Sequence, residues 1–228
     1  MIDARYFGIV LQKYKNYGDY RPFPFIFFIL IGLKKDKCAI VRQIMSNFAS
    51  VKRQTFGKVK RIILITGGQR SGKSVKAEER ALSLSVNPVY LATAHVWDDE
   101  FRERVRKHQQ RRGPEWTNIE EEICLSRHNL TDRVVVVDCV TLWLTNIFFA
   151  NDSDVDLSLR VAKREFDTFT QPPATYIFVT NEIGLGGVSE NALQRKFTDL
   201  QGWMNQYIAQ RADEVTLMVS GIGVEIKR

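Results

Sequence analysis

Ile62-Ile63-Leu64-Ile65-Thr66-Gly67-Gly68-Gln69-Arg70-Ser71-Gly72-Lys73-Ser74 is the stretch that decides the fold. It opens with an apolar run of strand length, and its remainder matches the pattern G-x-x-x-x-G-K-[ST]. An amphipathic stretch, residues 73–84, follows directly. The sequence therefore predicts a strand, a glycine loop and a helix in succession, which is the arrangement of a phosphate-binding loop, or P-loop.

The residue types in this loop indicate what it binds. Glycines let backbone N–H groups close around a phosphate, and the helix N-terminus adds its positive dipole end. Lys73 can reach the β- and γ-phosphate oxygens, and the Ser74 hydroxyl can hold Mg²⁺. The loop predicts binding of a nucleoside triphosphate, GTP or ATP, with Mg²⁺, but does not fix the reaction. The predicted binding residues are Gly67, Gly68, Gln69, Arg70, Ser71, Gly72, Lys73 and Ser74.

Outward from the loop, short apolar runs alternate with longer amphipathic stretches. The runs are nearly continuous in Val, Ile and Leu, which is typical of parallel strands buried on both faces. The alternation predicts an α/β fold with a P-loop NTPase-like, doubly wound, mostly parallel sheet. We expect Ser189 to cap the last helix. The expected strands are 62–66, 89–92, 134–137, 176–180 and 215–219, and the expected helices are 73–84, 98–112, 142–149, 155–169 and 189–211.

Charge divides the chain at about residue 60. Residues 1–60 hold 12 Lys or Arg against 3 Asp, whereas the remainder holds 21 basic and 23 acidic residues, so the net charge of +7 comes from the N-terminal stretch. A protein that reads nucleic acid needs positive charge on its folded surface, so we expect no nucleic-acid partner. We expect residues 1–60 to be a non-core N-terminal extension, poorly ordered or translated from a start assigned too early, with Met45 as an alternative start. Residues 61–228 form the predicted domain.

The extension contains an apolar run, residues 23–33, followed by three lysines. The run is shorter than the roughly 20 residues that span a bilayer, and no A-x-A cleavage site follows it. We expect membrane association only if residues 23–35 are present and exposed. The three cysteines, Cys38, Cys124 and Cys139, form no CxxC spacing. An odd count without a disulfide framework indicates a reducing, cytoplasmic location.

Asp138 ends the run Val134–Val137, and a carboxylate at the carboxyl end of a buried strand is where P-loop proteins hold Mg²⁺. The alternative is an aspartate that caps the following helix, and the glycine loop favours the metal role. Two further segments, 92–94 and 180–182, follow predicted strands. Ligands in open α/β sheets bind at these ends, but each segment alone fits a loop or a cap equally well.

The histidines are His95, His108 and His128, and His108 lies among basic residues. Neighbouring positive charges lower the pKa of a histidine, and neutral imidazole is the form that can attack phosphorus. From the residues alone, a solvated position on a charged helix face remains the favoured interpretation of His108.

Residues 61–228 resemble the bifunctional adenosylcobinamide kinase / adenosylcobinamide-phosphate guanylyltransferase family of cobalamin biosynthesis. The resemblance rests on several motifs in the same order and covers nearly all of the family's length, while residues 1–60 lie outside it. Beyond the glycine loop, the motifs are Tyr90-Leu91-Ala92-Thr93-Ala94, Asp98-Asp99-Glu100, His108, Trp116, Asp138-Cys139-Val140-Thr141-Leu142-Trp143, Thr180-Asn181-Glu182-Ile183-Gly184 and the closing segment 219–227.

The resemblance implies two reactions. GTP or ATP phosphorylates the aminopropanol hydroxyl of adenosylcobinamide, and GTP then guanylylates a histidine that passes GMP to adenosylcobinamide phosphate. It places the guanylylated histidine at His108, which reverses the interpretation from the residues alone. It further implies a homotrimer, and gives His95 and His128 no role. The implied nucleotide-binding positions, besides the loop, are Ala92, Thr93, Ala94, Gln109, Gln110, Arg111, Arg112, Glu120 and Asp138.

The sequence departs from the family in three places. Gly113 intervenes so that Pro114 lies one place late, Lys107 stands where some members have a second histidine, and the N-terminal extension is atypical. Because His108 remains, the nucleophile that the resemblance implies is kept. Two alternatives stay open: a P-loop small-molecule kinase without nucleotidyl transfer, and a nucleotide-dependent switch or binding module.

Overall fold

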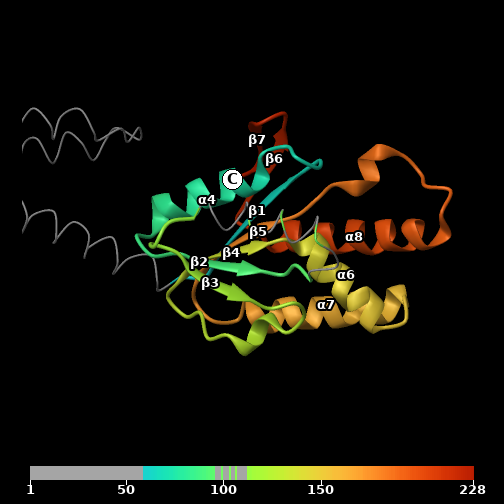
Figure 1. Ribbon diagram of the computed structural model, residues 1–228, viewed down its shortest axis with the longest axis horizontal. Helices are drawn as coiled ribbons and strands as arrows, with labels where there is room; N and C mark the ends of the chain where they lie inside the picture. The colour runs from blue at the N-terminus through green and yellow to red at the C-terminus, as the bar shows by residue number, and fades with distance from the viewer. Residues whose placement is uncertain (1–58, 96–98, 100–102, 104–105, 107–111) are drawn as a thin grey trace, which may run out of the picture. The chain divides into compact units, whose positions relative to one another are not determined.

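The computed structural model describes residues 59–95, 99, 103, 106 and 112–228 (Figure 1). They form a seven-stranded sheet in the order β3-β2-β4-β5-β1-β6-β7. Every neighbouring pair is parallel except β6 with β7, which is antiparallel. The predicted mostly parallel α/β sheet is therefore confirmed. The strands are β1 (Arg61–Gly67), β2 (Val89–Ala92), β3 (Thr117–Glu120), β4 (Val134–Asp138), β5 (Thr175–Val179), β6 (Glu214–Val219) and β7 (Ile222–Lys227).

The sequence prediction missed the two edge strands. β3 is short and largely exposed, so it has no apolar run to mark it. β7 is exposed along its whole length and follows β6 through a turn in which Ser220 and Gly221 have positive φ. The five predicted strands are present, although β5 ends at Val179, so Thr180 lies in the loop beyond it. Edge strands escape prediction because burial on both faces produces the apolar signal.

The helices are α4 (Lys73–Leu84), α6 (Val140–Ala150), α7 (Val155–Phe169) and α8 (Ala192–Arg211), with short 3-10 turns at Leu125–Arg127 and Ile183–Gly186. Ser189 as the cap of α8 was wrong. The N-cap is Asn191, whose side chain accepts hydrogen bonds from the backbone N–H groups of Leu193 and Gln194. Asparagine caps as well as serine, and Asn191 stands directly before the first residue of α8. Most of the expected helix 98–112 lies outside the described residues; of those described, Asp99, Glu103 and Arg106 are helical and Arg112 is not.

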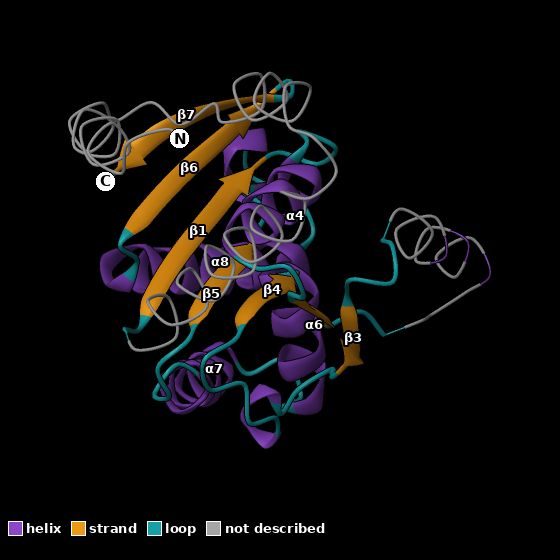
Figure 2. Cartoon of the chain, turned by 90° about the vertical axis from the view of Figure 1, so that its left-hand side faces the viewer, coloured by secondary structure: helices purple, strands orange, loops and turns teal. Residues whose placement is uncertain are grey.

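Helices cover both faces of the sheet. On one face, Ala77 and Ala81 of α4 pack against Ile63, Ile65 and Val136. The other face packs under α6, α7 and α8. The large side chains of this core are Trp143, Phe166, Phe169, Tyr176, Phe178 and Met204. Figure 1 shows α4 on one side of the strands and α7 on the other, and Figure 2 shows the strands from β7 to β3 in order. Burial on both faces leaves the strand ends as the open part of the sheet.

Among the described residues, no helix combines the length and apolarity that crossing a bilayer requires. The apolar run 23–33 and Met45 lie outside the described residues. The separation of residues 1–60 as an extension therefore stays a prediction.

Candidate active site

The carboxyl ends of five strands meet at one edge of the sheet because β3, β2, β4, β5 and β1 are mutually parallel. The glycine loop follows β1, and Asp138 ends β4. Between them lies the end of β5, and beside β4 lies the end of β2. The edge thus gathers the segments that sequence analysis singled out separately, as expected for ligand binding in an open α/β sheet.

The glycine loop turns tightly from β1 into α4. Gly67 and Gly72 have positive φ, at 147° and 95°, and Arg70 also has positive φ. A Cβ at Gly67 would collide with the Met218 carbonyl oxygen on β6. Glycine is therefore required at Gly67 both by the backbone angle and by the close approach of the neighbouring strand.

Lys73 is the buried cation of the loop. Its ammonium donates a hydrogen bond to the Gly68 carbonyl oxygen at 2.6 Å. Burial lowers the pKa of Lys73, while the nearby Cys139 and Asp138 side chains act to raise it. Desolvation disfavours the charged form, so a bound anion would stabilise the ammonium by supplying the charge that water no longer supplies. This makes Lys73 a suitable partner for phosphate.

Asp138 is fixed by an aromatic neighbour on β2. The Tyr90 hydroxyl donates to Asp138 Oδ2 at 2.6 Å, and the N-cap residue of α6 is Cys139. Asp138 therefore does not cap the next helix. Burial, and next the Asp138 carboxylate, raise the pKa of Tyr90 well above its usual value. The hydroxyl stays protonated and remains a donor to the carboxylate.

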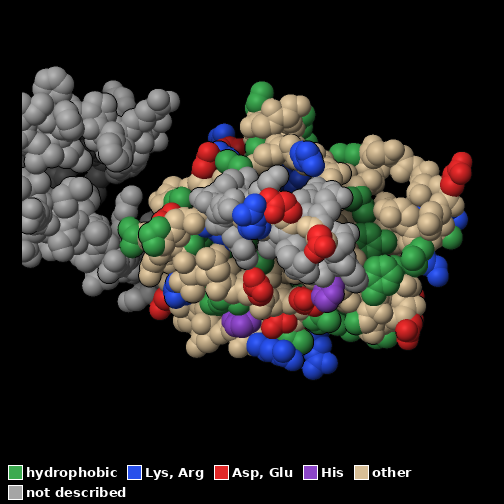
Figure 3. Space-filling model, viewed as in Figure 1, with side chains coloured by type: hydrophobic (Ala, Val, Ile, Leu, Met, Phe, Trp, Pro, Cys, Tyr) green, Lys and Arg blue, Asp and Glu red, His purple; other side chains and the backbone are tan. Residues whose placement is uncertain are grey.

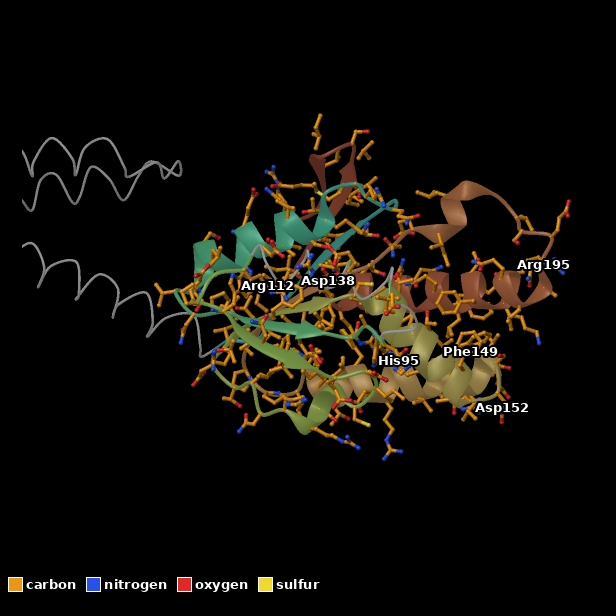
Figure 4. All side chains as sticks on the ribbon, in the orientation of Figure 1. His95, Arg112, Asp138, Phe149, Asp152 and Arg195 are labelled. Carbon is orange, nitrogen blue, oxygen red and sulfur yellow. The ribbon has the colours of Figure 1, made fainter. Side chains whose placement is uncertain are left out.

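Arg112 lies over the same tyrosine. Its guanidinium carbon is 3.6 Å from the centroid of the Tyr90 ring, and its Nε donates to Asn118 Oδ1 at 2.9 Å. The side chain is only 3% exposed, yet Nη1 is buried without a hydrogen-bond partner among the described residues; the Glu78 carboxylate is 4.0 Å away. Figure 4 shows Arg112 and Asp138 near one another. A buried donor without a partner is costly, which indicates a place for a ligand acceptor.

The segment after β2 is tied to β4 through Thr93. The buried Thr93 hydroxyl donates to the Cys139 carbonyl oxygen at 2.8 Å and accepts from the Cys139 N–H at 2.9 Å. Asn146 of α6 donates to the Thr93 carbonyl oxygen at 2.9 Å. Burial raises the pKa of the Cys139 thiol to about 12, so it stays protonated. These bonds fix the positions of Ala92 and Ala94 at the strand edge.

Residues 63–226 match the family described as cobinamide kinase / cobinamide phosphate guanyltransferase, with the family name CobU. The chain belongs to the CobU family. Membership makes it an enzyme, a transferase with kinase and nucleotidyltransferase character, and confirms the resemblance found in the sequence.

Two bacterial relatives cover most of their own length. The bifunctional adenosylcobalamin biosynthesis protein CobP of Pseudomonas aeruginosa is 38% identical over 168 residues, 72% of this chain and 96% of that protein. The protein of the same description named CobU, from Escherichia coli K12, is 38% identical over 182 residues, 73% of this chain and 99% of that protein. The archaeal flagellar accessory protein FlaH of Methanocaldococcus jannaschii aligns over 75% of this chain and 79% of its own, with 14% identity and a TM-score of 0.39, which is too remote to carry an argument.

Four of the predicted site residues lie outside the described residues: His108, Gln109, Gln110 and Arg111. Of the other predicted positions, Ser74 is half-buried in the first turn of α4, and Glu120 is exposed at the end of β3. His95 Nδ1 lies 2.8 Å from Glu122 Oε1, and His128 Nε2 lies 3.5 Å from Glu121 Oε2. Both histidines are therefore close to carboxylates, and Figure 4 shows His95 apart from Arg112 and Asp138.

The Ser74 hydroxyl and the Asp138 carboxylate are of the donor types that Mg²⁺ takes. Mg²⁺ takes oxygen ligands, usually one or two from protein with the rest from phosphate and water. The described residues hold no group of three or more His, Cys, Asp or Glu that could bind a metal by themselves. That donor set fits a metal carried in with the nucleotide.

Sequence reasoning missed two contributors to this edge. Tyr90 entered the sequence analysis only within the second strand and a family motif. Glu182 entered it only within a family motif and segment 180–182, which fits a ligand-binding strand end or a loop or cap. Glu182 Oε1 accepts hydrogen bonds from the Thr66 hydroxyl at 2.6 Å and from Asn205 Nδ2 at 3.0 Å. The signal for Glu182 was its position after an apolar strand. Its partner on α8, Asn205, is distant in sequence, so the sequence alone does not reveal this hydrogen bond.

Proposed function

We propose that this chain phosphorylates the aminopropanol hydroxyl of adenosylcobinamide with GTP or ATP, and then transfers GMP from GTP through His108 to the phosphorylated product, giving adenosylcobinamide-GDP. One observation carries the proposal: within the matched family region, the buried Lys73 ammonium and the Asp138 carboxylate lie at one strand edge beneath a complete phosphate-binding loop. The proposal also rests on the descriptions of the family and of its two bacterial relatives.

In the first reaction, the chain's own residues bind and orient the triphosphate. The backbone of Gly67 to Ser74 surrounds the phosphates, and the Lys73 ammonium exchanges the Gly68 carbonyl oxygen for a phosphate oxygen. The buried Nη1 of Arg112, which lies 4.0 Å from the Glu78 carboxylate and makes no hydrogen bond to the described residues, is proposed to donate to a further acceptor of the nucleotide. Ser74 and Asp138 would hold Mg²⁺, which supplies charge neutralisation on the β- and γ-phosphates.

In the second reaction, His108 is the nucleophile. Neutral imidazole attacks the α-phosphorus of GTP, pyrophosphate leaves, and the phosphoramidate then passes GMP to the phosphate oxygen of the acceptor. Gln109, Gln110, Arg111 and Arg112 adjoin the nucleophile and are proposed to contact the nucleotide, as are Ala92, Thr93, Ala94, Glu120 and Asp138. The covalent route divides one displacement between two steps.

Intact-mass measurement before and after incubation with GTP tests this function. The wild type should gain the mass of GMP in a bond that is labile in acid and stable in base. His108→Ala should lose the adduct and keep measurable kinase activity, whereas His128→Ala, the matched control, should keep both. An adduct that persists in His108→Ala would remove His108 as the nucleophile. Phosphorylation without any adduct in the wild type would instead identify a kinase without nucleotidyl transfer.

The assembly and location of the protein are part of the same proposal. Val219, Ile222, Val224 and Ile226 are exposed apolar residues on β6 and β7, which supports a homo-oligomer, a trimer by resemblance. Acidic and basic side chains are interspersed on the face in Figure 3, which favours a small-molecule substrate over nucleic acid. We propose a cytoplasmic enzyme, with membrane association only through residues 23–35. Light scattering after size exclusion measures the oligomeric state, and fractionation with and without residues 1–60 measures the location.

A further inference from the structure

The end of β5 occupies a central place in the site. β5 lies between β1 and β4, with Ile65 opposite Val179 on one side and Asp138 opposite Val179 on the other. The residues that follow β5 therefore emerge between the glycine loop and Asp138. These residues are Thr180, Asn181 and Glu182, and none of them has a role in the proposed function so far.

Glu182 is attached to the start of the glycine loop by backbone and side chain. Its N–H donates to the Gly67 carbonyl oxygen at 3.1 Å, and its Oε1 accepts from the Thr66 hydroxyl at 2.6 Å. Asn205 Nδ2 donates to the same Oε1 at 3.0 Å. Hydrogen bonds from the described residues reach only Oε1, and the side chain is partly exposed. The second oxygen, Oε2, is thus the acceptor that this arrangement leaves for a substrate.

The donor Asn205 is itself held in one orientation. Its Oδ1 accepts from the Thr180 hydroxyl at 2.7 Å and from Gln201 Nε2 at 2.9 Å, while its Nδ2 also donates to the Asn181 carbonyl oxygen at 3.0 Å. Thr180, Gln201 and Asn205 are all buried. Because the amide oxygen is occupied by two donors, Nδ2 must point toward the carboxylate. A buried, connected network of this kind holds a side chain rigidly.

We propose that Glu182 is the general base of the phosphoryl-transfer step, a proposal that rests on the proposed kinase function. The acceptor hydroxyl oxygen attacks the γ-phosphorus, and its proton moves to Glu182 Oε2. The bond between the γ-phosphorus and the β,γ-bridging oxygen breaks, and the nucleoside diphosphate leaves with that electron pair. The proton passes from Glu182 to water afterwards. Atoms and charge balance without any further reactant.

Glu182 has this role in the first reaction alone, for a chemical reason. The kinase acceptor is an alcohol, which must lose a proton to form the phosphate ester. The acceptor of GMP is a phosphate oxygen that is already ionised at neutral pH, and the protein nucleophile for guanylylation is neutral imidazole. Neither needs a carboxylate base. Removing the Glu182 carboxylate should therefore separate the two activities.

The experiment uses the full-length protein with two separate assays. Phosphorylation is measured on adenosylcobinamide, and GMP transfer is measured on chemically supplied adenosylcobinamide phosphate. Glu182→Gln keeps an oxygen that can accept from Thr66 and Asn205, so the fold should be retained. We expect its kinase kcat to fall about 10²- to 10⁴-fold, the usual contribution of a general base, with little change in KM for the nucleotide. GMP transfer should remain within about threefold of wild type.

Glu182→Ala provides a second test that does not depend on the glutamine variant. Formate added to Glu182→Ala should restore part of the kinase activity, because a small carboxylate can replace the missing base. Thr66→Val is the matched control, since it removes one hydrogen bond to Oε1 and leaves the carboxylate. Its kinase activity should fall less than about tenfold, and formate should not raise it.

Any outcome of these assays other than those expected above overturns the proposal. Equal losses of kinase and GMP transfer in Glu182→Gln would make Glu182 a structural residue or a shared phosphate-site residue. Unchanged phosphorylation in Glu182→Gln, or no response of Glu182→Ala to formate, would exclude the base. Failure of the wild type to phosphorylate adenosylcobinamide would refute the proposed function itself. An active wild type with an equally active Glu182→Gln would refute only the role of Glu182 as the base.

Discussion

Two polar clusters lie at the end of β5, and they differ in how extensively hydrogen bonds join their side chains. The β4-side cluster, Tyr90, Arg112 and Asp138, contains a buried guanidinium nitrogen without a partner among the described residues. The β1-side cluster, Thr66, Thr180, Glu182, Gln201 and Asn205, is joined by five side-chain hydrogen bonds. In that second cluster, Gln201 Oε1 is the buried atom left without a partner among those residues.

The difference indicates that the β4-side cluster binds ligand and the β1-side cluster positions a side chain. A buried donor without a partner carries a free-energy cost that a ligand can remove, so the β4-side cluster is arranged to bind. A connected network orders its members in advance, so the β1-side cluster is arranged to hold one carboxylate and the adjoining loop. Variants in the first cluster should therefore change ligand affinity, whereas variants that break the second network, such as substitutions of Asn205, should change the free energy of unfolding.

Lys73→Ala should have the largest effect, because the β4-side charges act together with this ammonium. We expect kinase kcat/KM to fall about 10³-fold, as when a charge-stabilising donor is removed from a transition state. Steady-state phosphorylation measures kcat/KM, and calorimetry measures the affinity for GTP. Lys76→Ala, an exposed lysine on the same helix, is the matched control and should behave as wild type. Unchanged GTP affinity in Lys73→Ala would remove the glycine loop from the site.

Arg112→Met should weaken GTP binding about 10- to 100-fold, the range expected when one charged hydrogen bond is lost. Methionine keeps an unbranched chain over the Tyr90 ring, so much of the packing remains. Arg112→Lys keeps the charge but loses the planar guanidinium, so its GTP affinity should lie between those of the wild type and Arg112→Met. Affinity equal to wild type together with a lower melting temperature would show that Arg112 serves the fold rather than the ligand.

The sequence predicted the parts of the fold that bury apolar surface on both faces. The central strands and helices 73–84 and 155–169 match because each apolar pattern reports its own burial. The edge strands β3 and β7 were missed because they have little buried surface. The cap of α8 was misplaced because Ser189 and Asn191 are equally good caps in sequence, and only the turn geometry distinguishes them.

The candidate site was predictable only where a motif is contiguous. The glycine loop carries its chemistry within one segment, and Asp138 follows an obvious strand. The bonds of Tyr90 to Asp138 and of Asn205 to Glu182 join residues that are 48 and 23 positions apart, so no local pattern reveals them. Strand order creates the first pair, and the position of α8 beside the end of β5 creates the second; neither was read from the sequence.

Asn205→Leu tests the β1-side cluster as a structural unit. Leucine cannot donate to Glu182 or accept from Thr180, so buried polar groups lose their partners, and we expect the free energy of unfolding to fall by about 1–3 kcal/mol. Urea unfolding followed by circular dichroism measures it. Gln206→Leu, the next residue on the exposed side of α8, should change it by less than about 0.5 kcal/mol. Equal effects of the two substitutions would contradict the network.

Tyr90→Phe should have the smallest effect on activity, because it removes one hydroxyl and leaves the ring beneath Arg112. Asp138 then loses the donor that fixes its carboxylate, but it is partly exposed and can regain a water molecule. We expect the Mg²⁺ concentration for half-maximal kinase activity to rise about three- to tenfold, or about 1 kcal/mol. Titration of Mg²⁺ at fixed GTP measures this change.

The pH dependence of Tyr90→Phe sharpens the assignment. Burial and the Asp138 carboxylate raise the pKa of Tyr90 well above its usual value, so its hydroxyl remains protonated throughout the neutral range. The ratio of Tyr90→Phe to wild-type activity should therefore be constant between about pH 6 and pH 9. A ratio that changes within that range would mean that Tyr90 ionises, and that the hydroxyl acts on a proton rather than holding Asp138 for the metal.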